Sequence, residues 1–179
     1  SRSWTGIDPD AESVRLAVEG ISLPNVEFLE GSADKLAWPE SSFDVVVFTL
    51  SLHHMPLDMM PSAIDEAVRV VRPDGRVLFL EPMPEGSYFE AGRRFGCGGG
   101  DERRQLAYAV YVMMSSGRLS EIEEFTDRVS EEYDSFEDFL EHSAIRPGTE
   151  SQLREYVADA GYTLDERFRL NVFRVDRGE

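Results

Sequence analysis

The stretch that decides the fold is residues 42–55, which read Ser-Phe-Asp-Val-Val-Val-Phe-Thr-Leu-Ser-Leu-His-His-Met. Residues 44–50 within it form an almost continuous apolar run. Runs of this kind are typical of strands that are buried on both faces, and such strands belong to parallel sheets covered by helices. The stretch therefore predicts a central strand of an α/β sheet, followed directly by two histidines.

The next elements along the chain support this interpretation. Residues 61–72 carry apolar side chains at helical spacing on one face, which predicts a helix. Residues 72–75, Arg-Pro-Asp-Gly, have the composition of a turn, and residues 76–81 are again strongly apolar. A strand, a helix and a second strand in this order favour an α/β sheet. We therefore expect residues 44–50 and 76–81 to be parallel neighbours.

The segment before residue 42 extends the same alternation. Residues 4–8 read as the end of a buried strand that stops at Pro9, and Asp10 can cap the helix that follows. Residues 25–30 predict a short strand, which ends before Gly31. Strands and helices thus alternate from the start of the sequence, as in an α/β fold.

Residues 83–148 differ in character from the rest of the chain. They begin with loops, including a glycine-rich run at residues 96–100 that we interpret as a cap loop because no apolar strand leads into it. We expect these residues to form a helical cap, inserted into an α/β core made of residues 1–82 and 149–179. The apolar and aromatic stretches that follow the loops predict helices over about 101–116, 119–132 and 135–143.

The last part of the chain returns to the core. A helix is expected over about residues 150–160, with Gly161 as its C-cap. Residues 162–168 and 170–176 then predict two strands of an antiparallel hairpin, joined tightly at Arg169.

Composition excludes several classes of function. The 179 residues include 35 acidic and 18 basic side chains, for a net charge of −17, so nucleic acids and anionic membranes are poor partners. The single cysteine, Cys97, excludes an internal disulfide and a multi-cysteine zinc site, and we predict no metal ligands. No apolar run is long enough to span a membrane, and no secretory signal is recognisable. A cytoplasmic location is expected.

Four segments together carry a resemblance to a known family: TGIDPD at 5–10, EGSADKLAWP at 30–39, residues 42–55, and VRVVRPDGRVLFLEP at 68–82. In this order and spacing they resemble class I S-adenosylmethionine-dependent methyltransferases, of the branch that acts mainly on small molecules. The resemblance implies a Rossmann-like sheet, S-adenosylmethionine as cofactor and methyl transfer to a small-molecule acceptor.

The resemblance also implies roles for residues at the end of the first strand. Cofactors bind at the carboxyl ends of strands in open α/β sheets, and Asp8 stands at such an end. Its carboxylate could accept hydrogen bonds from both ribose hydroxyls, and Pro9 would lie against the adenine. The alternative role for Asp8 is a helix cap, for which Asp10 is better placed.

A second group of cofactor contacts is expected after residues 25–30. Family members commonly have an aspartate next to the loop glycine, which receives the adenine amino group. Ser32 occupies that position here, so the contact moves to Asp34 or weakens. The backbone N–H of Ala33 could still bind the adenine ring, and a solvated loop acid is the alternative interpretation of Asp34.

The third group follows the central strand. Leu50 and His54 are expected to contact the cofactor, and His53 is the candidate catalytic residue because a histidine can take a proton from a hydroxyl or amine nucleophile. Histidines at this place in the family often only contact the cofactor or shape the loop. The third histidine, His142, is expected on a surface helix.

The chain departs from the family at its start. In the family a first strand and a glycine-rich loop precede the segment that begins here at Trp4. We expect that strand to come from residues outside this sequence or from a partner chain, because an unfilled gap would expose strand edges. The competing hypotheses are half of a complemented enzyme and an inactive methyltransferase-like binding or scaffold subunit.

Overall fold

The structure is a computed structural model that describes residues 3–143 and 145–176. Residues 1–2 and 177–179 of the expected core and residue 144 of the expected cap lie outside the described residues. The elements are β1 (Trp4–Asp8), α1 (Ala11–Gly20), β2 (Val26–Glu30), β3 (Phe43–Thr49), the 3₁₀ helix η1 (Leu52–His54), α2 (Met60–Val70), β4 (Val71–Pro82), α3 (Ser87–Phe95), α4 (Arg103–Ser115), β5 (Leu119–Glu132), α5 (Phe136–His142), α6 (Glu150–Asp159) and β6 (Thr163–Val175).

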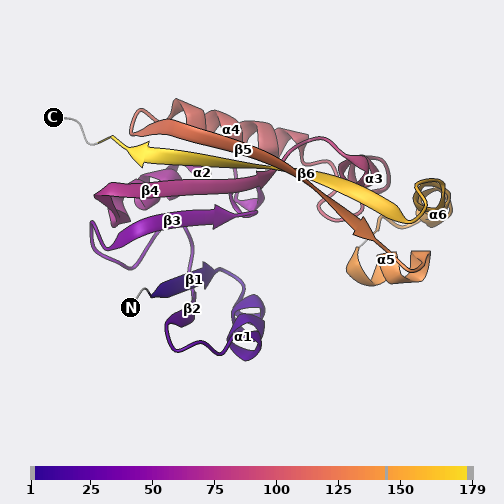
Figure 1. The fold of residues 1–179 in the computed structure, drawn as a ribbon, viewed down its shortest axis with the longest axis horizontal. Coiled ribbons are helices and arrows are strands. Elements are labelled where there is room, and N and C mark those ends of the chain that lie inside the picture. Colours follow the sequence, from indigo (N-terminus) through magenta and orange to yellow (C-terminus); the bar gives the residue numbers. More distant parts are fainter. Residues whose placement is uncertain (1–2, 144, 177–179) are drawn as a thin grey trace.

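The strands form two sheets (Figure 1). The larger has the order β3-β4-β6-β5, with β3 and β4 parallel and β6 antiparallel to both its neighbours. The register from Val45↔Arg76 to Thr49↔Leu80 confirms that the two apolar runs are parallel neighbours. The smaller sheet is the parallel pair β1–β2. In the described residues, β1 does not pair with β3.

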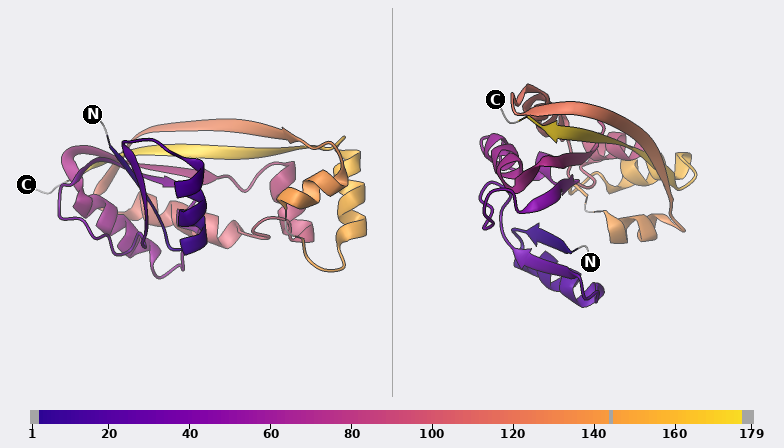
Figure 2. Two further views of the ribbon diagram at one scale, coloured as in Figure 1. Left: turned by 90° about the horizontal axis from the view of Figure 1, so that it is seen from below. Right: turned by 60° about the vertical axis from the view of Figure 1, so that its left-hand side comes forward.

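One face of the larger sheet carries the main core. Side chains of α2 and α4 pack against alternate residues of β4, and Figure 2 shows these helices on one side of the sheet. On the opposite face of β3, Val45 and Val47 are each 41% exposed. The main core contains Phe48, Met60, Ile64, Val68, Val77, Phe79, Ala109, Met113 and Phe173 among its buried residues.

A second hydrophobic cluster lies at the far end of β5 and β6, where α3, α5 and α6 gather (Figure 1). It includes Phe136, Phe139, Leu153 and Leu164, all almost fully buried. Strands of 14 and 13 residues at about 3.3 Å per residue are long enough to run from the main core to this cluster. The two long strands therefore extend from one hydrophobic cluster to the other.

The helix expected over 119–132 is wrong, because these residues form strand β5. Apolar side chains at Leu119, Ile122, Phe125 and Val129 have the three- and four-residue spacing of a helix face. In the structure a register shift between Glu121 and Glu123 marks a bulge at Ile122. The bulge breaks the two-residue alternation of the strand and so imitates a helical pattern.

The expected C-terminal hairpin is also wrong. β6 runs without a break through Arg169, which pairs in register with Glu81 of β4 on one side and Thr126 of β5 on the other. A single arginine supplies no turn conformation, and the antiparallel partners of β6 are β4 and β5, which both lie earlier in the sequence. The other expected helices are confirmed as α1, α2, α4, α5 and α6. Within the described residues, no helix has the length and apolar character needed to cross a membrane.

Candidate active site

The chain turns sharply where β3 ends. Leu50 adopts a left-handed conformation with a φ of 50°, and its N–H donates to the carbonyl of Leu80 at 2.8 Å. This conformation is unfavourable for a residue with a Cβ, so the surrounding contacts must hold it. The turn leads directly into η1, which brings the two histidines to the carboxyl end of the β3–β4 pair.

A buried carboxylate anchors η1. Glu81, near the end of β4, accepts the N–H of Leu52 at 3.0 Å and the N–H of His53 at 3.4 Å. It is also hydrogen-bonded to Nδ1 of the His53 ring. Glu81 is 1% exposed and His53 is 3% exposed. Because an ionised carboxylate only accepts, Nδ1 of His53 is the donor to Glu81, and a neutral His53 ring in this tautomer has its lone pair on Nε2.

His54 lies at the surface beside its neighbour. The centroids of the two imidazole rings are 4.0 Å apart, and the His54 side chain is 61% exposed. Nδ1 of His54 is 3.5 Å from Oε1 of Glu102, the residue before α4. Glu166 of β6 has a raised pKa, first because it is partly buried and then because of the negative charges of Glu131 and Glu102. This region therefore concentrates carboxylates around the two histidines.

The two aspartates after β1 have separate roles. Asp10 is the N-cap of α1 and accepts both the N–H and the hydroxyl of Ser13, at 3.0 and 2.8 Å, which lowers the pKa of Asp10. Oδ1 of Asp8 accepts the N–H of Asp10 at 2.8 Å. The other carboxylate oxygen of Asp8 accepts no hydrogen bond from residues 3–143 or 145–176. The expectation that Asp10 is the cap is confirmed, and Asp8 keeps an oxygen for a ligand. Pro9 beside it is exposed.

The loop after β2 brings three expected cofactor contacts together. The hydroxyl of Ser32 donates to Oδ1 of Asp34, so the serine orients the aspartate. Ala33 is half-buried and packs against the main core. Ser32 also forms an isolated antiparallel bridge with Lys35, which closes the loop into a tight turn. The loop is therefore ordered by its own contacts.

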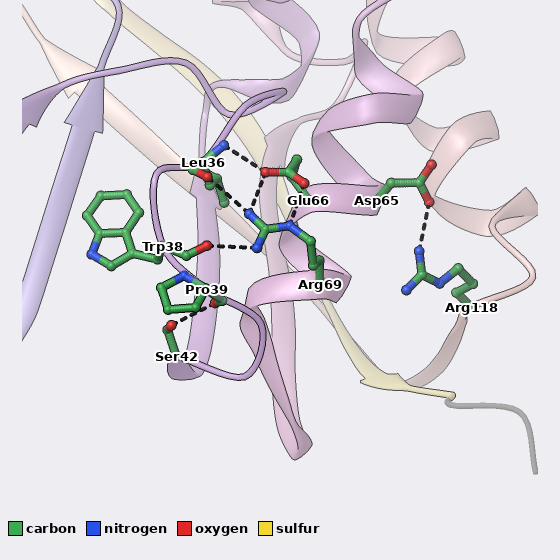
Figure 3. Close-up of polar contacts among 8 residues, drawn as sticks. All are labelled: Leu36, Trp38, Pro39, Ser42, Asp65, Glu66, Arg69 and Arg118. Carbon is green, nitrogen blue, oxygen red and sulfur yellow. Dashed lines mark hydrogen bonds and ion pairs between the residues drawn. The ribbon is translucent and has the colours of Figure 1, made fainter.

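A polar network fastens this loop to α2 (Figure 3). Oε2 of Glu66 accepts the N–H of Leu36 at 2.8 Å, and the Arg69 guanidinium donates to the carbonyls of Leu36 and Trp38 at 3.0 and 2.7 Å. Arg69 and Glu66 pair at 2.6 Å, and this bond lowers the pKa of Glu66. In this way α2, which packs in the main core, positions the loop that leaves the smaller sheet.

Two hollows lie near these elements. One, of about 190 Å³, is bordered by Asp8 together with Ser13 and Val14 of α1 and with Phe28. The larger, of about 540 Å³, is lined by Ser41, Asp44 and residues 72–75, at the amino end of β3. Because α/β sheets bind cofactors at the carboxyl ends of their strands, the larger hollow lies at the wrong end to be a cofactor site.

Part of this sequence is similar to known proteins. Residues 2–79 match the family described as "Methyltransferase domain". The phthiotriol/phenolphthiotriol dimycocerosates methyltransferase of Mycobacterium leprae is 34% identical over 82 residues, which are 46% of this chain and 30% of that protein. Over residues 2–79 the chain is therefore similar to methyltransferase domains.

Solved structures are similar in fold to nearly the whole chain and not only to residues 2–79. A putative methyltransferase from Bacillus halodurans has a TM-score of 0.64 at 18% identity, over 95% of this chain and 81% of that one. The YcgJ protein of Bacillus subtilis has a TM-score of 0.59 at 17% identity, over 99% and 84%. These likenesses show the Rossmann-like methyltransferase fold. The chain spans about a third of the length of the curated relatives that it matches.

Residues 2–79 carry polar groups that suit the adenosine half of S-adenosylmethionine. One carboxylate oxygen of Asp8, at a strand end, accepts no hydrogen bond from the described residues, and ribose hydroxyls need such an acceptor. The Ser32–Asp34 loop and the His53–His54 pair follow two further strands. The cofactor contacts of these residues are predictions.

Three groups in and around the candidate site cannot be recognised by sequence reasoning alone or are missed by it. The pattern places Glu81 only at the end of an apolar strand, although a lone acid in such a run signals a buried partner. It places Glu66 and Arg69 only on a helix, because their contacts are to backbone groups of a distant loop. Glu102 gives no signal, since nothing in the sequence predicts its contact with His54.

Proposed function

We propose that this chain is part of an S-adenosylmethionine-dependent enzyme that transfers a methyl group to a small molecule. The observation that carries the proposal is the Asp8 carboxylate, which has a free oxygen at a strand end within the residues that are similar to methyltransferase domains. Asp8 would bind the ribose with Pro9 against the adenine, and the Ser32–Asp34 loop would bind the adenine edge. Leu50 and His54 would contact the cofactor from the end of β3.

Methyl transfer from this cofactor needs little acid–base or nucleophilic chemistry from the side chains. When bound, the cofactor supplies a methyl group on a sulfonium, which is already an activated electrophile. The residues of the chain must hold the acceptor in line and exclude water. Residues 83–148, the proposed cap, would cover the acceptor. His53 is the proposed base, because Glu81 fixes its ring and leaves Nε2 able to take a proton.

We propose a cytoplasmic location, which the single buried thiol of Cys97 supports. We also propose that a further strand, from residues outside this sequence or from a partner chain, pairs between β1 and β3. Among residues 3–143 and 145–176, β1 pairs with β2 alone and β3 with β4 alone. Exposed Val45 and Val47 on β3 and Trp4 on β1 support the proposal, since unpartnered apolar strands rarely stay uncovered.

Replacing Asp8 with alanine should weaken binding of S-adenosylhomocysteine by about 1–3 kcal/mol, because the ribose hydroxyls lose their acceptor. The measurement is isothermal titration calorimetry on a form of the protein that binds this ligand. The matched control is Asp10→Ala, two residues away. It removes the cap of α1 and should cost about 1 kcal/mol of stability while leaving the affinity unchanged. Equal affinities of the Asp8→Ala variant and the parent would remove Asp8 from the site.

Residues 1–179 alone should bind S-adenosylhomocysteine weakly, because the proposed strand is needed to complete the sheet beside Asp8. Native mass spectrometry together with calorimetry tests this. We expect a form that includes the proposed strand, as further residues or as a partner chain, to bind in the micromolar range. Tight binding by a monomer of residues 1–179 would overturn the strand proposal. Failure of every form to bind would overturn methyl transfer and favour a scaffold.

A further inference from the structure

The methyl-transfer proposal uses His53 and His54 separately, gives Glu102 no role and does not explain why the three side chains cluster. Each of the three offers one ligand atom, and these atoms all lie within 4.8 Å of one another. The histidines come from η1 and the glutamate from the residue that precedes α4, almost fifty positions later in the sequence. Three groups able to ligate a metal thus converge from two separate elements. A metal on His53 would occupy the nitrogen proposed as the base, so the two roles of His53 exclude each other at any one time.

We propose that these three side chains bind a divalent transition metal of the zinc class. The His53 ring is held in place by a buried carboxylate. Its Nδ1 is bonded to Glu81, which also accepts the N–H of Leu52 at 3.0 Å, and in the neutral tautomer that donates to Glu81 the lone pair for a metal is on Nε2. A carboxylate that orients a histidine through the nitrogen opposite the metal is a recurrent feature of protein metal sites.

The glycine-rich loop makes room for the third ligand. A Cβ at Gly99 would lie 1.9 Å from Oε1 of Glu102, so any other residue there would displace the carboxylate. The Glu102 side chain is 19% exposed and therefore partly shielded, whereas His54 is 61% exposed. The site is accordingly lined on one side by protein and open on the other, where an ion can enter.

The donor set determines the kind of ion. Two imidazole nitrogens with one carboxylate oxygen suit Zn²⁺ and its neighbours, while Mg²⁺ and Ca²⁺ prefer oxygen ligands throughout. Three protein ligands leave at least one coordination position open for water or another small ligand. A surface ion pair between His54 and Glu102 is the alternative interpretation, but such a pair would need neither His53 nor its buried partner.

The test is a zinc titration of the metal-free chain, by competition with a chromophoric chelator and without cofactor or acceptor. Its result is therefore independent of methyl transfer. Because His53 is buried, the ligand variants are His54→Ala and Glu102→Gln, which remove exposed or partly exposed groups. Each should weaken zinc binding at least tenfold, and Mg²⁺ should not compete.

The matched control is His142→Ala. His142 is also exposed and lies 3.9 Å from a carboxylate oxygen of Asp138, but it belongs to no three-ligand cluster within the described part of the chain. This variant should bind zinc like the parent. Cobalt(II) absorption should show the band pattern of a low-coordinate site in the parent and lose it in Glu102→Gln. The proposal is overturned if the parent binds no zinc, or if both ligand variants stay within twofold of the parent.

Discussion

Replacing Glu81 with alanine should lower the free energy of unfolding by about 3–5 kcal/mol, because it leaves a buried histidine and two backbone donors without their acceptor. Glu81 is 1% exposed and bonds to Leu52, to the backbone of His53 and to its ring. Water cannot replace these bonds without opening the core. Urea unfolding followed by circular dichroism measures the change, which is a large part of the 5–15 kcal/mol typical of a domain.

Two further variants show whether the loss comes from these bonds. Glu81→Gln keeps one acceptor oxygen and should recover part of the stability. Glu85→Ala removes an acid four residues later that is 49% exposed and paired with Arg167 at 2.8 Å. It should change stability by less than about 0.5 kcal/mol, as surface pairs usually do. If Glu81→Ala is no worse than Glu85→Ala, Glu81 does not anchor η1.

The parts of the fold that sequence reasoning predicted are those with local signals. The runs at 44–50 and 76–81 are continuous, and their lengths suit strands rather than helices, although one face of the first run is exposed. Asp10 is followed by a helix and does cap it. At each of these places the local preference of the residues and the tertiary structure agree, which is why pattern alone sufficed.

The parts that could not be predicted depend on distant contacts. β5 and β6 pair across more than thirty residues, and nothing local tells a bulged edge strand from a helix face. The same holds for the candidate site. His53 and His54 were found because they follow a strand, but Glu81 and Glu102 reach them only through the pairing of β4 with β3 and the packing of α4. The sequence pattern thus indicates the two histidines, whereas only the three-dimensional fold shows which carboxylates contact them.

Replacing Phe79 with alanine should lower the free energy of unfolding by about 3–5 kcal/mol, because it empties the centre of the main core. Phe79 is fully buried on β4. Its ring stacks on Phe48 at 4.9 Å between centroids and meets the edge of Phe173 at 5.6 Å. One side chain thus joins β3, β4 and β6, and no neighbouring backbone can close the gap without breaking the ladder between strands.

Phenylalanine-to-alanine substitutions at two other positions show how much of the lost stability comes from burial of the ring and how much from its size. Phe125→Ala removes an equal ring that is 51% exposed on the edge strand β5, so its cost should be much smaller. Phe139→Ala empties the second cluster, where the ring is also fully buried. Because β5 and β6 run through both clusters, we expect Phe79→Ala and Phe139→Ala to shift one common unfolding transition. Two separate transitions would show that the long strands do not couple the clusters, and a cost for Phe79→Ala equal to that of Phe125→Ala would show that Phe79 is not central to the core.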